Sequence, residues 1–393
     1  MIDFSPTDEQ RLLVDNVRRF VRTEILPLEA DLDPDAGELD PTDHQRLVAV
    51  AERMGLRNWE APAEVGGPGL DVVTQALLAI EMSQHRAGLY APCYGVFGSP
   101  GLVQLVEGTE EQKQRYLYPT LRGELTAFFG LSEPSGGSDP AGAIRTTATR
   151  DGGDWMITGT KLWISNADRA DYGLVLARTG TGRRDITAFL VDTDSPGFTV
   201  RRIVHTLRTT HPATELELDA VRVPDRNRVG EVDRGFALAA DRLVRSRIPY
   251  AAGCLGVAIV AHGMAVEYAK IRETFGKRLS EQQGIQWMLV DNEIDLRTSR
   301  LLILAAARRA DLGEDIRADA AIAKLVCSEA AGRVVDRAMQ IHGGLGVSKD
   351  LPLERWYREL RIRRIGEGPS EVQRLIVARH LLGGSGRHDD RRS

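Results

Sequence analysis

Cysteine is scarce in this chain of 393 residues, which contains only Cys93, Cys254 and Cys327. Their odd number and wide separation exclude a disulfide framework and a C-x-x-C metal site. Lysine is scarce as well, since only six of the 51 basic residues are lysines and the rest are arginines. We therefore expect a cytoplasmic protein from a bacterium with a GC-rich genome.

Long apolar runs and targeting signals are also missing. No stretch of about 18 apolar residues occurs, and the N-terminal MIDFSPTDEQ lacks both the basic and the apolar parts of a signal peptide. The net charge of −5 argues against a general electrostatic attraction to nucleic acid or to anionic lipid. The sequence thus predicts neither a membrane span nor a nucleic-acid partner.

Three familiar catalytic signatures do not occur. The histidines are dispersed and no H-E-x-x-H is present, so we expect no metal site. There is no G-x-S-x-G nucleophile motif. The glycine-rich loop Phe128–Ala141 is not a G-x-G-x-x-G that follows a strand and opens a helix, so a Rossmann nucleotide site is not supported.

The hydrophobic pattern changes its period twice along the chain. Apolar residues recur at helical spacing up to about residue 122, and helical spacing returns from Gly235 to Leu382. Between them lie short segments rich in Val, Ile, Thr and aromatic residues, separated by glycine turns. This order predicts an α+β fold with an N-terminal all-α domain (1–122), a middle β-barrel or sandwich domain (123–234) and a C-terminal helical bundle (235–382). The polar tail 383–393 is predicted to be disordered.

The segments behind this prediction are short in the middle of the chain and long near its end. The expected strands are Thr126–Leu131, Arg145–Arg150, Asp154–Thr158, Lys161–Ile164, Tyr172–Arg178, Thr187–Asp192, Phe198–Ile203 and Thr214–Val223. The expected helices include one that begins at Thr7, His44–Met54, Val72–Ser83, Thr109–Leu121, Ala251–Thr274, Gln283–Arg309, Arg317–Ile341 and Leu353–Arg364.

One break in the C-terminal helices places a single carboxylate, Glu367, between two glycines. Pro369 lacks a backbone N–H and restricts the residue before it, so a helix is expected to stop here. Ser370 and Glu371 then offer caps for the helix that follows. Glu367 has two interpretations: a base that takes a proton from a bound substrate, or an exposed loop glutamate.

Two segments of the middle domain also have a functional and a structural interpretation. The loop Phe128–Ala141 offers N–H groups and hydroxyls to a polar ring edge or a phosphate, or is a long hairpin loop. In Gly159–Ala167, Trp163 and Ser165 are two positions apart on a strand, so both are expected on one face. They suit a planar cofactor, unless Trp163 is a core residue.

Two segments of the bundle are equally ambiguous. Arg272–Gln286 offers Arg272 to a diphosphate and Phe275 to a ring, or is an ordinary helix-to-helix connection. In Gln340–Gly346 the glycine pair lets the backbone approach a cofactor, or it ends a helix, and His342 is more often packed or exposed than catalytic.

The basic run formed by Arg355, Arg358, Arg361, Arg363 and Arg364 is interrupted by acids. It is therefore interpreted as a solvated helix face on which carboxylates pair with Arg358 and Arg361.

Taken together and in order, these motifs resemble the acyl-CoA dehydrogenase family of flavoproteins. The matching stretches are EPSGGSD, GTKLWISNA, RETFG with Gln283, QIHGGLG and IGEGPSEVQR, and the resemblance extends from about Phe4 to Leu382. It implies an N-terminal helical domain, a middle β-domain, a C-terminal four-helix bundle and bound FAD, usually in a homotetramer.

The resemblance also implies the residues of the site. Trp163, Ile164 and Ser165 match the stretch that packs on the flavin, while Arg272 and Phe275 match residues that reach the FAD of a neighbouring subunit. All residues that match FAD contacts are Leu131, Ser132, Ser138, Trp163, Ile164, Ser165, Arg272, Phe275, Gln282, Gln283, Gln340, Gly343, Gly344, Pro369 and Glu371. Those that match substrate contacts are Ser138, Arg247, Gly366 and Gly368.

Glu367 matches the family's catalytic base. Some members carry the base instead where this chain has Ser246, which is a poor base at neutral pH. The chemistry implied is removal of the α-proton by Glu367 and transfer of the β-hydride to the flavin, which yields a trans-2-enoyl thioester. The electrons would then pass to an electron-transfer flavoprotein.

Three positions depart from the family's usual pattern. Pro369 replaces a common Thr, Val244 replaces a common Asp, and Gly366 replaces a common aromatic residue. The small Gly366 predicts a wider pocket for a branched or cyclic acyl group.

Three alternatives keep the fold and change the function. In the first alternative, the acyl group is carried by an acyl carrier protein of secondary metabolism rather than by CoA. In the second, the enzyme is an oxidase or a monooxygenase. A flavoprotein that binds nucleic acid through its arginine-rich face is disfavoured by the acids within that run. The assembly is a homotetramer or a homodimer.

Overall fold

The computed structural model describes residues 5–98 and 103–383. The chain divides into two compact units. The first, called the helical unit, consists of Met1–His44, Asp71–Gly95 and Val244–Ser393. The second, called the sheet unit, consists of Gln45–Leu70 and Val96–Leu243. The predicted disordered tail falls almost entirely outside the described residues.

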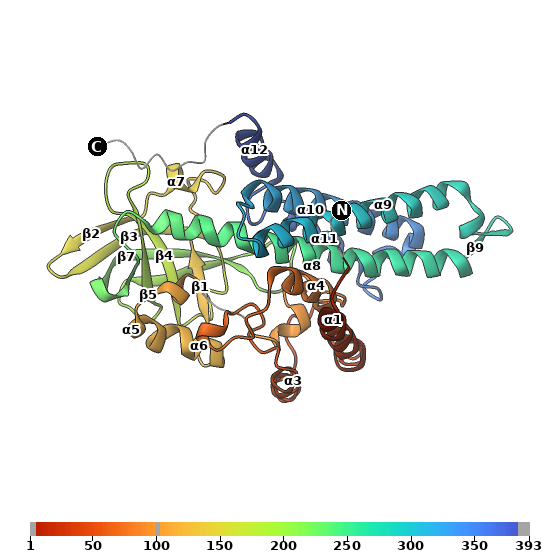
Figure 1. Cartoon of the computed structure of the whole chain (residues 1–393), viewed down its shortest axis with the longest axis horizontal. Coiled ribbons are helices and arrows are strands. Elements are labelled where there is room, and N and C mark those ends of the chain that lie inside the picture. The colour runs from red at the N-terminus through yellow and green to blue at the C-terminus, as the bar shows by residue number, and fades with distance from the viewer. Residues whose placement is uncertain (1–4, 99–102, 384–393) are drawn as a thin grey trace. The chain divides into compact units, whose positions relative to one another are not determined.

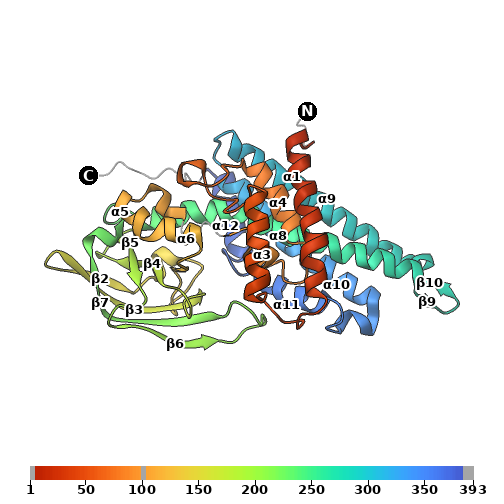
Figure 2. The same ribbon diagram turned by 90° about the horizontal axis from the view of Figure 1, so that it is seen from below.

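The sheet unit is built on an eight-stranded sheet with the order β6-β7-β3-β2-β4-β5-β8, in which β1 also pairs with β4. Its strands are β1 (Ala127–Gly130), β2 (Thr147–Asp151), β3 (Asp154–Ser165), β4 (Tyr172–Arg178), β5 (Ile186–Asp192), β6 (Phe198–Val204), β7 (Ala213–Pro224) and β8 (Arg228–Val229). Most neighbours are antiparallel, whereas β1 and β2 run parallel to β4. The strand β6 forms one edge, next to the long strand β7 (Figure 2).

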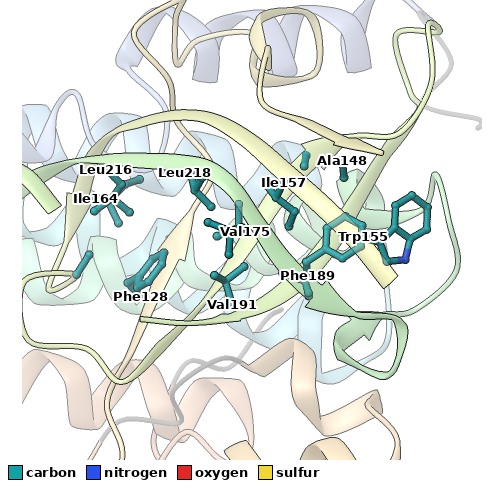
Figure 3. Close-up of a cluster of buried hydrophobic side chains, with 14 of the residues drawn as sticks. Phe128, Ala148, Trp155, Ile157, Ile164, Val175, Phe189, Val191, Leu216 and Leu218 are labelled. Atoms are coloured by element: carbon teal, nitrogen blue, oxygen red, sulfur yellow. The ribbon is translucent and has the colours of Figure 1, made fainter. Parts of the chain in front are cut away.

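Alternating side chains of these strands form the sheet unit's core. Trp155 packs against Phe189 with ring centroids 5.2 Å apart, and Phe128 packs against Phe198 at 5.8 Å. Aliphatic residues such as Val175 fill the space between the aromatic pairs (Figure 3). Burial of such aromatic and aliphatic surface is the main force that holds a sheet of this size together.

Short helices of the sheet unit accompany these strands. They are α3 (Pro41–Arg53), of which the first turn belongs to the helical unit, α5 (Glu110–Gln112), the π-helical turn Lys113–Leu117, α6 (Tyr118–Arg122) and α7 (Pro140–Ala143). The 3-10 turns of this unit are Ala63–Val65, Val103–Glu107 and Asp225–Asn227.

All predicted strands are present, with two differences. Asp154–Thr158 and Lys161–Ile164, predicted as separate strands, form the single strand β3. The register of β3 against β7 shifts at two points, between Ile157 and Gly159 and between Leu162 and Ile164. At each β-bulge the strand bends and continues, but the alternation of buried and exposed residues is interrupted. A prediction based on that alternation therefore divides β3 into two strands. The two-residue strand β8 was not predicted.

Long helices make up the helical unit. They are α1 (Asp8–Phe20), α2 (Leu26–Glu29), α4 (Val72–Met82), α8 (Gly235–Ile271, whose first residues belong to the sheet unit), α9 (Gln283–Asp311), α10 (Arg317–His342), α11 (Leu353–Arg363) and α12 (Ser370–Leu381). The shorter turns are the π-helical Val21–Ile25 and the 3-10 turns Pro92–Gly95, Leu279–Glu281 and Gly343–Val347. The helices α8 and α9 run side by side toward the β9–β10 hairpin in both views (Figures 1 and 2).

Small residues let these helices approach closely, as their composition predicted. A Cβ on Gly256 of α8 would lie 2.3 Å from the carbonyl oxygen of Ile80 in α4, so only glycine fits at this crossing. The helix α10 buries a series of alanines, including Ala320 and Ala321, and packs against α9, α11 and α12. The predicted bundle is confirmed.

Helix ends agree with the sequence at the start of α1 and at the end of α10, and differ at the start of α12. Thr7 forms the capping box of α1 with Gln10, and Asp8 and Glu9 occupy the first turn as predicted. Gly343, with φ 60°, ends α10, and His342 is packed on Tyr268 with ring centroids 4.5 Å apart. The predicted cap of α12 is wrong, because Pro369 occupies the N-cap position with no side-chain cap and Ser370 lies inside the helix.

The segment Arg272–Gln286 is not a simple connection between helices. Glu273–Thr274 (β9) and Lys277–Arg278 (β10) form an antiparallel hairpin. Phe275 and Gly276, with φ of 52° and 74°, form its two-residue turn. The turn carries no Asn-Gly or Asp-Gly signal, so the hairpin was missed.

Helix α8 also contains an 18-residue window with a mean hydropathy of 1.5, long and apolar enough to cross a membrane by composition alone. In the structure, 61% of this window is buried inside the protein, as in a core helix. The apolar run therefore has a structural explanation. Within residues 5–98 and 103–383, no cluster of His, Cys, Asp and Glu side chains is arranged to hold a metal ion.

Candidate functional site

Glu367 lies in a left-handed turn between α11 and α12. Its φ is 56° and that of Gly368 is 93°. For a residue other than glycine this conformation costs about 1 to 2 kcal/mol, so surrounding contacts must hold it. Glu367 therefore lies outside both helices and not on the face of either one.

Two buried side chains hold this turn from different helices. Gln373 of α12 donates from Nε2 to the carbonyl oxygens of Glu367 at 3.1 Å and of Gly368 at 2.9 Å. Lys324 of α10 donates from Nζ to the carbonyl of Gly368 at 2.8 Å and more weakly to that of Arg364 at 3.4 Å. Neither Lys324 nor Gln373 is solvent-exposed. Burial lowers the pKa of Lys324 to about 8, so its ammonium form is retained at neutral pH.

The glutamate's carboxylate is held by α8. The hydroxyl of Ser246 donates to Oε2 of Glu367 at 3.1 Å. The next residue, Arg247, is only 6% exposed, and burial lowers its pKa while the charge of Glu367 opposes that shift. Ser246, at the position expected for the alternative base, thus hydrogen-bonds the carboxylate of Glu367.

Gly366, before the turn, does not simply leave open space. A Cβ on this residue would lie 2.7 Å from the hydroxyl of Tyr250 in α8. The same hydroxyl lies 3.3 Å from the carbonyl oxygen of Arg363, to which it donates. The prediction that Gly366 widens the pocket therefore needs correction, because the phenol of Tyr250 occupies the space beside it.

A buried arginine lies beside Tyr250. The guanidinium carbon of Arg363 lies 4.1 Å from the ring centroid of Tyr250 and 4.5 Å from that of Tyr90. The interpretation of the basic run as a solvated face is wrong for Arg363 and for Arg355, which are 8% and 1% exposed. It holds for Arg361 and Arg364, which are exposed, while Arg358 is paired with Glu354 and Asp35.

In the sheet unit, Trp163 interrupts the regular alternation of β3. Its φ is 66°, it sits at the bulge between Leu162 and Ile164, and its side chain is 56% exposed. Trp163 is therefore not a core residue, and the argument that it shares a face with Ser165 through simple alternation is wrong. Ile164 is buried in the core, and the hydroxyl of Ser165 accepts a hydrogen bond from Arg208 at 2.9 Å.

Two of the sequence motifs are joined by a buried ion pair that the sequence did not predict. Lys161, two residues before Trp163, lies 2.8 Å from Glu133, the first residue of EPSGGSD. Glu133 also accepts hydrogen bonds from the backbone of Arg145 at 2.6 Å and of Thr146 at 3.1 Å. Lys161 and these N–H groups lower the pKa of Glu133 despite its burial, so the pair is ionised.

This ion pair anchors the loop that contains the predicted flavin-edge residues. Leu131 is buried, and the carbonyl of Ser132 accepts a hydrogen bond from the backbone of Leu162 at 2.9 Å. Ser138 is exposed at a cavity of about 390 Å³, whose other lining residues are Ser135, Gly136, Gly137, Asp139, Gly142, Ala143 and Arg145.

Of the remaining predicted FAD contacts, Pro369 and Glu371 lie at the start of α12, next to the Glu367 turn. The others lie elsewhere in the helical unit. Arg272 and the fully exposed Phe275 belong to the β9–β10 hairpin, and Gln282 and Gln283 begin α9. Gln340, Gly343 and Gly344 lie where α10 ends. Along α8, Ser246 and Arg272 are separated by roughly 39 Å at the rise of an α-helix, so the hairpin and the Glu367 turn are distinct places.

Family models for three domains of one protein family together match almost the whole chain. They are the acyl-CoA dehydrogenase N-terminal domain over residues 7–124, the middle domain over 128–221 and the C-terminal domain over 233–382. The chain belongs to the acyl-CoA dehydrogenase family. The resemblance seen in the sequence is thereby confirmed, together with the three-part α+β architecture. The chain is an oxidoreductase of this family, and FAD is its cofactor.

Individual relatives agree with this assignment over at least nine-tenths of their own length. The rat mitochondrial short-chain specific acyl-CoA dehydrogenase is 36% identical over 95% of this chain and 90% of its own. The butyryl-CoA dehydrogenase of Megasphaera elsdenii has a TM-score of 0.85 at 32% identity and covers 97% of this chain and 100% of its own. The structure of PigA in complex with FAD has a TM-score of 0.88 at 25% identity, over 98% and 100% of the two chains.

The residues around Glu367 that sequence analysis missed lie on the helices α8, α10, α11 and α12 and, in the case of Tyr90, in a turn outside the helices. They are Tyr90, Tyr250, Lys324, Arg363 and Gln373. A lysine within an alanine-rich helix was the one available signal, because a charge on the apolar face of a buried helix needs an internal partner.

Proposed function

We propose that this acyl-CoA dehydrogenase family member catalyses α,β-dehydrogenation of an acyl-CoA thioester, with Glu367 as the base that removes the α-proton. The observation that carries the proposal is the Glu367 turn. A strained, left-handed glutamate held by Lys324, Gln373 and Ser246 is costly to maintain and is typical of a functional position. An exposed loop glutamate would need none of these contacts.

The residues present fit a flavin. Trp163 offers an exposed aromatic ring from a bulge that keeps it out of the core, and the loop after β1 offers the hydroxyls of Ser132 and Ser138. We propose these residues, with Leu131, Ile164 and Ser165, as contacts of FAD. When bound, FAD supplies an acceptor for the hydride that leaves the β-carbon.

The chain's own groups perform the proton chemistry. The carboxylate of Glu367 accepts the α-proton, and the hydroxyl of Ser246 orients that carboxylate. The backbone N–H of Glu367 donates to the thioester carbonyl and stabilises the negative charge that develops on it. Lys324 and Gln373 bind the turn's carbonyl oxygens, which fixes the direction of that N–H.

The bundle carries a surface suited to self-assembly. Trp287, Val290, Ile294 and Leu301 recur along α9 and are each more than half exposed, and Phe275 is fully exposed on the hairpin. Apolar side chains at helical spacing on an exposed face are typical of an interface. We propose a homo-oligomer, either a tetramer or a dimer, in which this face is covered and the hairpin reaches the FAD of a neighbouring subunit.

Electrons leaving the reduced flavin are proposed to pass to an electron-transfer flavoprotein in a bacterial cytoplasm. The Cys residues within the described ranges, Cys93, Cys254 and Cys327, are buried and unpaired, so they offer no exposed redox centre for this step.

The test is anaerobic titration of the purified holoenzyme with a panel of acyl-CoA thioesters while flavin absorbance is recorded. Wild type is expected to bleach, and Glu367→Gln is expected to retain FAD and lose bleaching by at least about 1000-fold in rate, since the base is removed. Glu267→Gln, an exposed position on α8, serves as the matched control and is expected to bleach normally. Bleaching that survives in Glu367→Gln would take the base role away from Glu367.

A further inference from the structure

One hydrogen bond joins a proposed FAD contact of the sheet unit to the loop that connects β6 and β7. Ser165 ends β3 and pairs in register with Ala213, the first residue of β7. Residues 205–212 connect β6 to β7, so this loop ends beside Ser165. From the loop, Arg208 donates through Nη2 to Oγ of Ser165 at 2.9 Å, and both side chains are partly buried.

This hydrogen bond fixes the role of the serine hydroxyl. A hydroxyl has one proton to donate and two lone pairs to accept with, whereas a guanidinium has donors and no acceptor. Ser165 must therefore accept from Arg208, and its own proton is left for another partner. Within residues 5–98 and 103–383 the hydroxyl of Ser165 donates to no acceptor. The arginine thus makes Ser165 a hydrogen-bond donor toward a ligand or solvent.

Two further polar atoms on the same two segments point to a ligand rather than solvent. Asn166 follows Ser165 and Thr210 lies two residues after Arg208, and in the described part of the chain Oδ1 of Asn166 and Oγ1 of Thr210 are buried without a hydrogen-bond partner. Buried polar atoms without a partner are rare in folded proteins and need an explanation. The ring of Trp163, on the same strand, is more than half exposed. These features fit a site that a bound planar group completes.

A hydroxyl held as a donor has a definite effect on flavin reduction. Transfer of the β-hydride brings two electrons to the ring system, so negative charge develops on it. Donors that are already oriented toward such charge stabilise it, because they need no reorganisation when it appears. The cation of Arg208 strengthens this donor, since it polarises the O–H group with which it shares an oxygen. Arg208 and Ser165 together therefore favour the reduced flavin over the oxidised one.

We infer that Arg208 is a positioning residue, which holds the hydroxyl of Ser165 as a donor toward FAD and thereby raises the reduction potential of the bound flavin. This inference rests on the proposed function, in which Ser165 contacts FAD, and adds a residue that lies outside the sequence motifs. The reaction balances as in the proposed function: the α-proton goes to Glu367 and the β-hydride with its electron pair goes to FAD. No bond forms or breaks at Arg208 or Ser165.

The experiment measures the reduction potential of the flavin in the holoenzyme by slow anaerobic reduction beside an indicator dye of known potential. Arg208→Met is expected to lower the equilibrium constant for two-electron reduction about tenfold, which corresponds to about 30 mV. Arg208→Lys is expected to change it less than about threefold, because lysine keeps a charged donor. Arg222→Met is the matched control and is expected to leave the potential unchanged, since Arg222 is exposed near the other end of β7 and pairs with Asp151 and Asp154.

A second background tests whether the arginine acts through the serine. In Ser165→Ala holoenzyme, Arg208→Met is expected to change the equilibrium constant less than about threefold, because the hydroxyl that Arg208 orients is gone. An unchanged potential in Arg208→Met, or an equal shift in both backgrounds, would overturn the inference. If Arg208→Met releases FAD, Arg208→Gln is measured in its place with the same criteria.

These potentials are measured without acyl-CoA, so they are independent of the proton chemistry at Glu367. A wild-type holoenzyme that no acyl-CoA bleaches would contradict the proposed function even if the potentials shift as expected. Bleaching by an acyl-CoA with no effect of Arg208→Met on the potential would contradict only the inference.

Discussion

The two ends of helix α11 each bury an arginine, and the two arginines have opposite surroundings. Arg355, near the start, donates to Glu359 at 3.0 Å and to the carbonyls of Pro34 at 3.0 Å and Ala36 at 2.7 Å. Arg363, at the end, lies against the rings of Tyr90 and Tyr250, and its Nε has no acceptor in the described part of the chain. The first arginine is held by oxygen acceptors, and the second is held by aromatic rings.

The comparison shows that burial alone does not reveal the role of a charged residue. Both side chains are at least nine-tenths buried, both lie on one helix, and both stand in one basic run of the sequence. What differs is whether the protein itself supplies the oxygen acceptors that a desolvated guanidinium needs. Substitutions at the two positions should therefore affect different measurements.

The largest effect is expected on stability at the start of α11. Arg355→Met leaves Glu359 as a buried charge without its partner and removes the donor from two carbonyls, so the free energy of unfolding should fall by about 3 to 5 kcal/mol. Arg363→Met strands no acid and should change it by less than about 1 kcal/mol. Urea denaturation of both variants, with Arg361→Met as the exposed control, checks this contrast. Equal losses of unfolding free energy for Arg355→Met and Arg363→Met would contradict the difference between the two arginines.

The third buried cation, Lys324, gives an effect that depends on pH. Burial lowers its pKa from 10.5 to about 8, so between these values the folded protein has released a proton that the unfolded chain still holds. Stability therefore rises with pH across this window, because the penalty for burying the charge disappears. Below pH 8 the full penalty remains, which amounts to about 3 kcal/mol at 1.4 kcal/mol per pKa unit.

The measurement is the difference in unfolding free energy between wild type and Lys324→Met from pH 7 to pH 10.5. This difference should grow in favour of wild type with increasing pH by up to about 3 kcal/mol. A flat difference would mean that Lys324 titrates near its ordinary value and is not desolvated in solution.

Much of the fold could be predicted from periodicity because most segments obey one period throughout. Strand β4 was predicted with its observed bounds, and α9, α10 and α11 were predicted within two residues at each end. The failures fall where the backbone leaves its regular conformation. Trp163 in a left-handed bulge and Phe275 in a left-handed turn both defeat a rule that assumes strict alternation or helical spacing.

The candidate site was predictable only as far as motifs extend along the sequence. Glu367 was identified from its glycine-flanked break and from the family resemblance, and Ser246 was identified as a position of interest that cannot act as a base. Tyr250, Lys324 and Gln373 were missed, because their contacts with the turn join helices more than forty residues apart or depend on a side-chain direction. Such contacts follow from packing, which no local pattern encodes.

The smallest expected effect concerns Tyr250, which supports Arg363 and fills the space beside Gly366. Its hydroxyl makes one long hydrogen bond of 3.3 Å, so Tyr250→Phe should cost about 0.5 to 1 kcal/mol and keep the ring under Arg363. Gly366→Ala places a Cβ 2.7 Å from that hydroxyl and should cost about 1 to 3 kcal/mol. In the double variant the clash is relieved, so the two costs should not add, with a coupling of about 0.5 to 2 kcal/mol in a double-mutant cycle of unfolding free energies. Strictly additive costs would show that Tyr250 does not occupy the space beside Gly366 in solution.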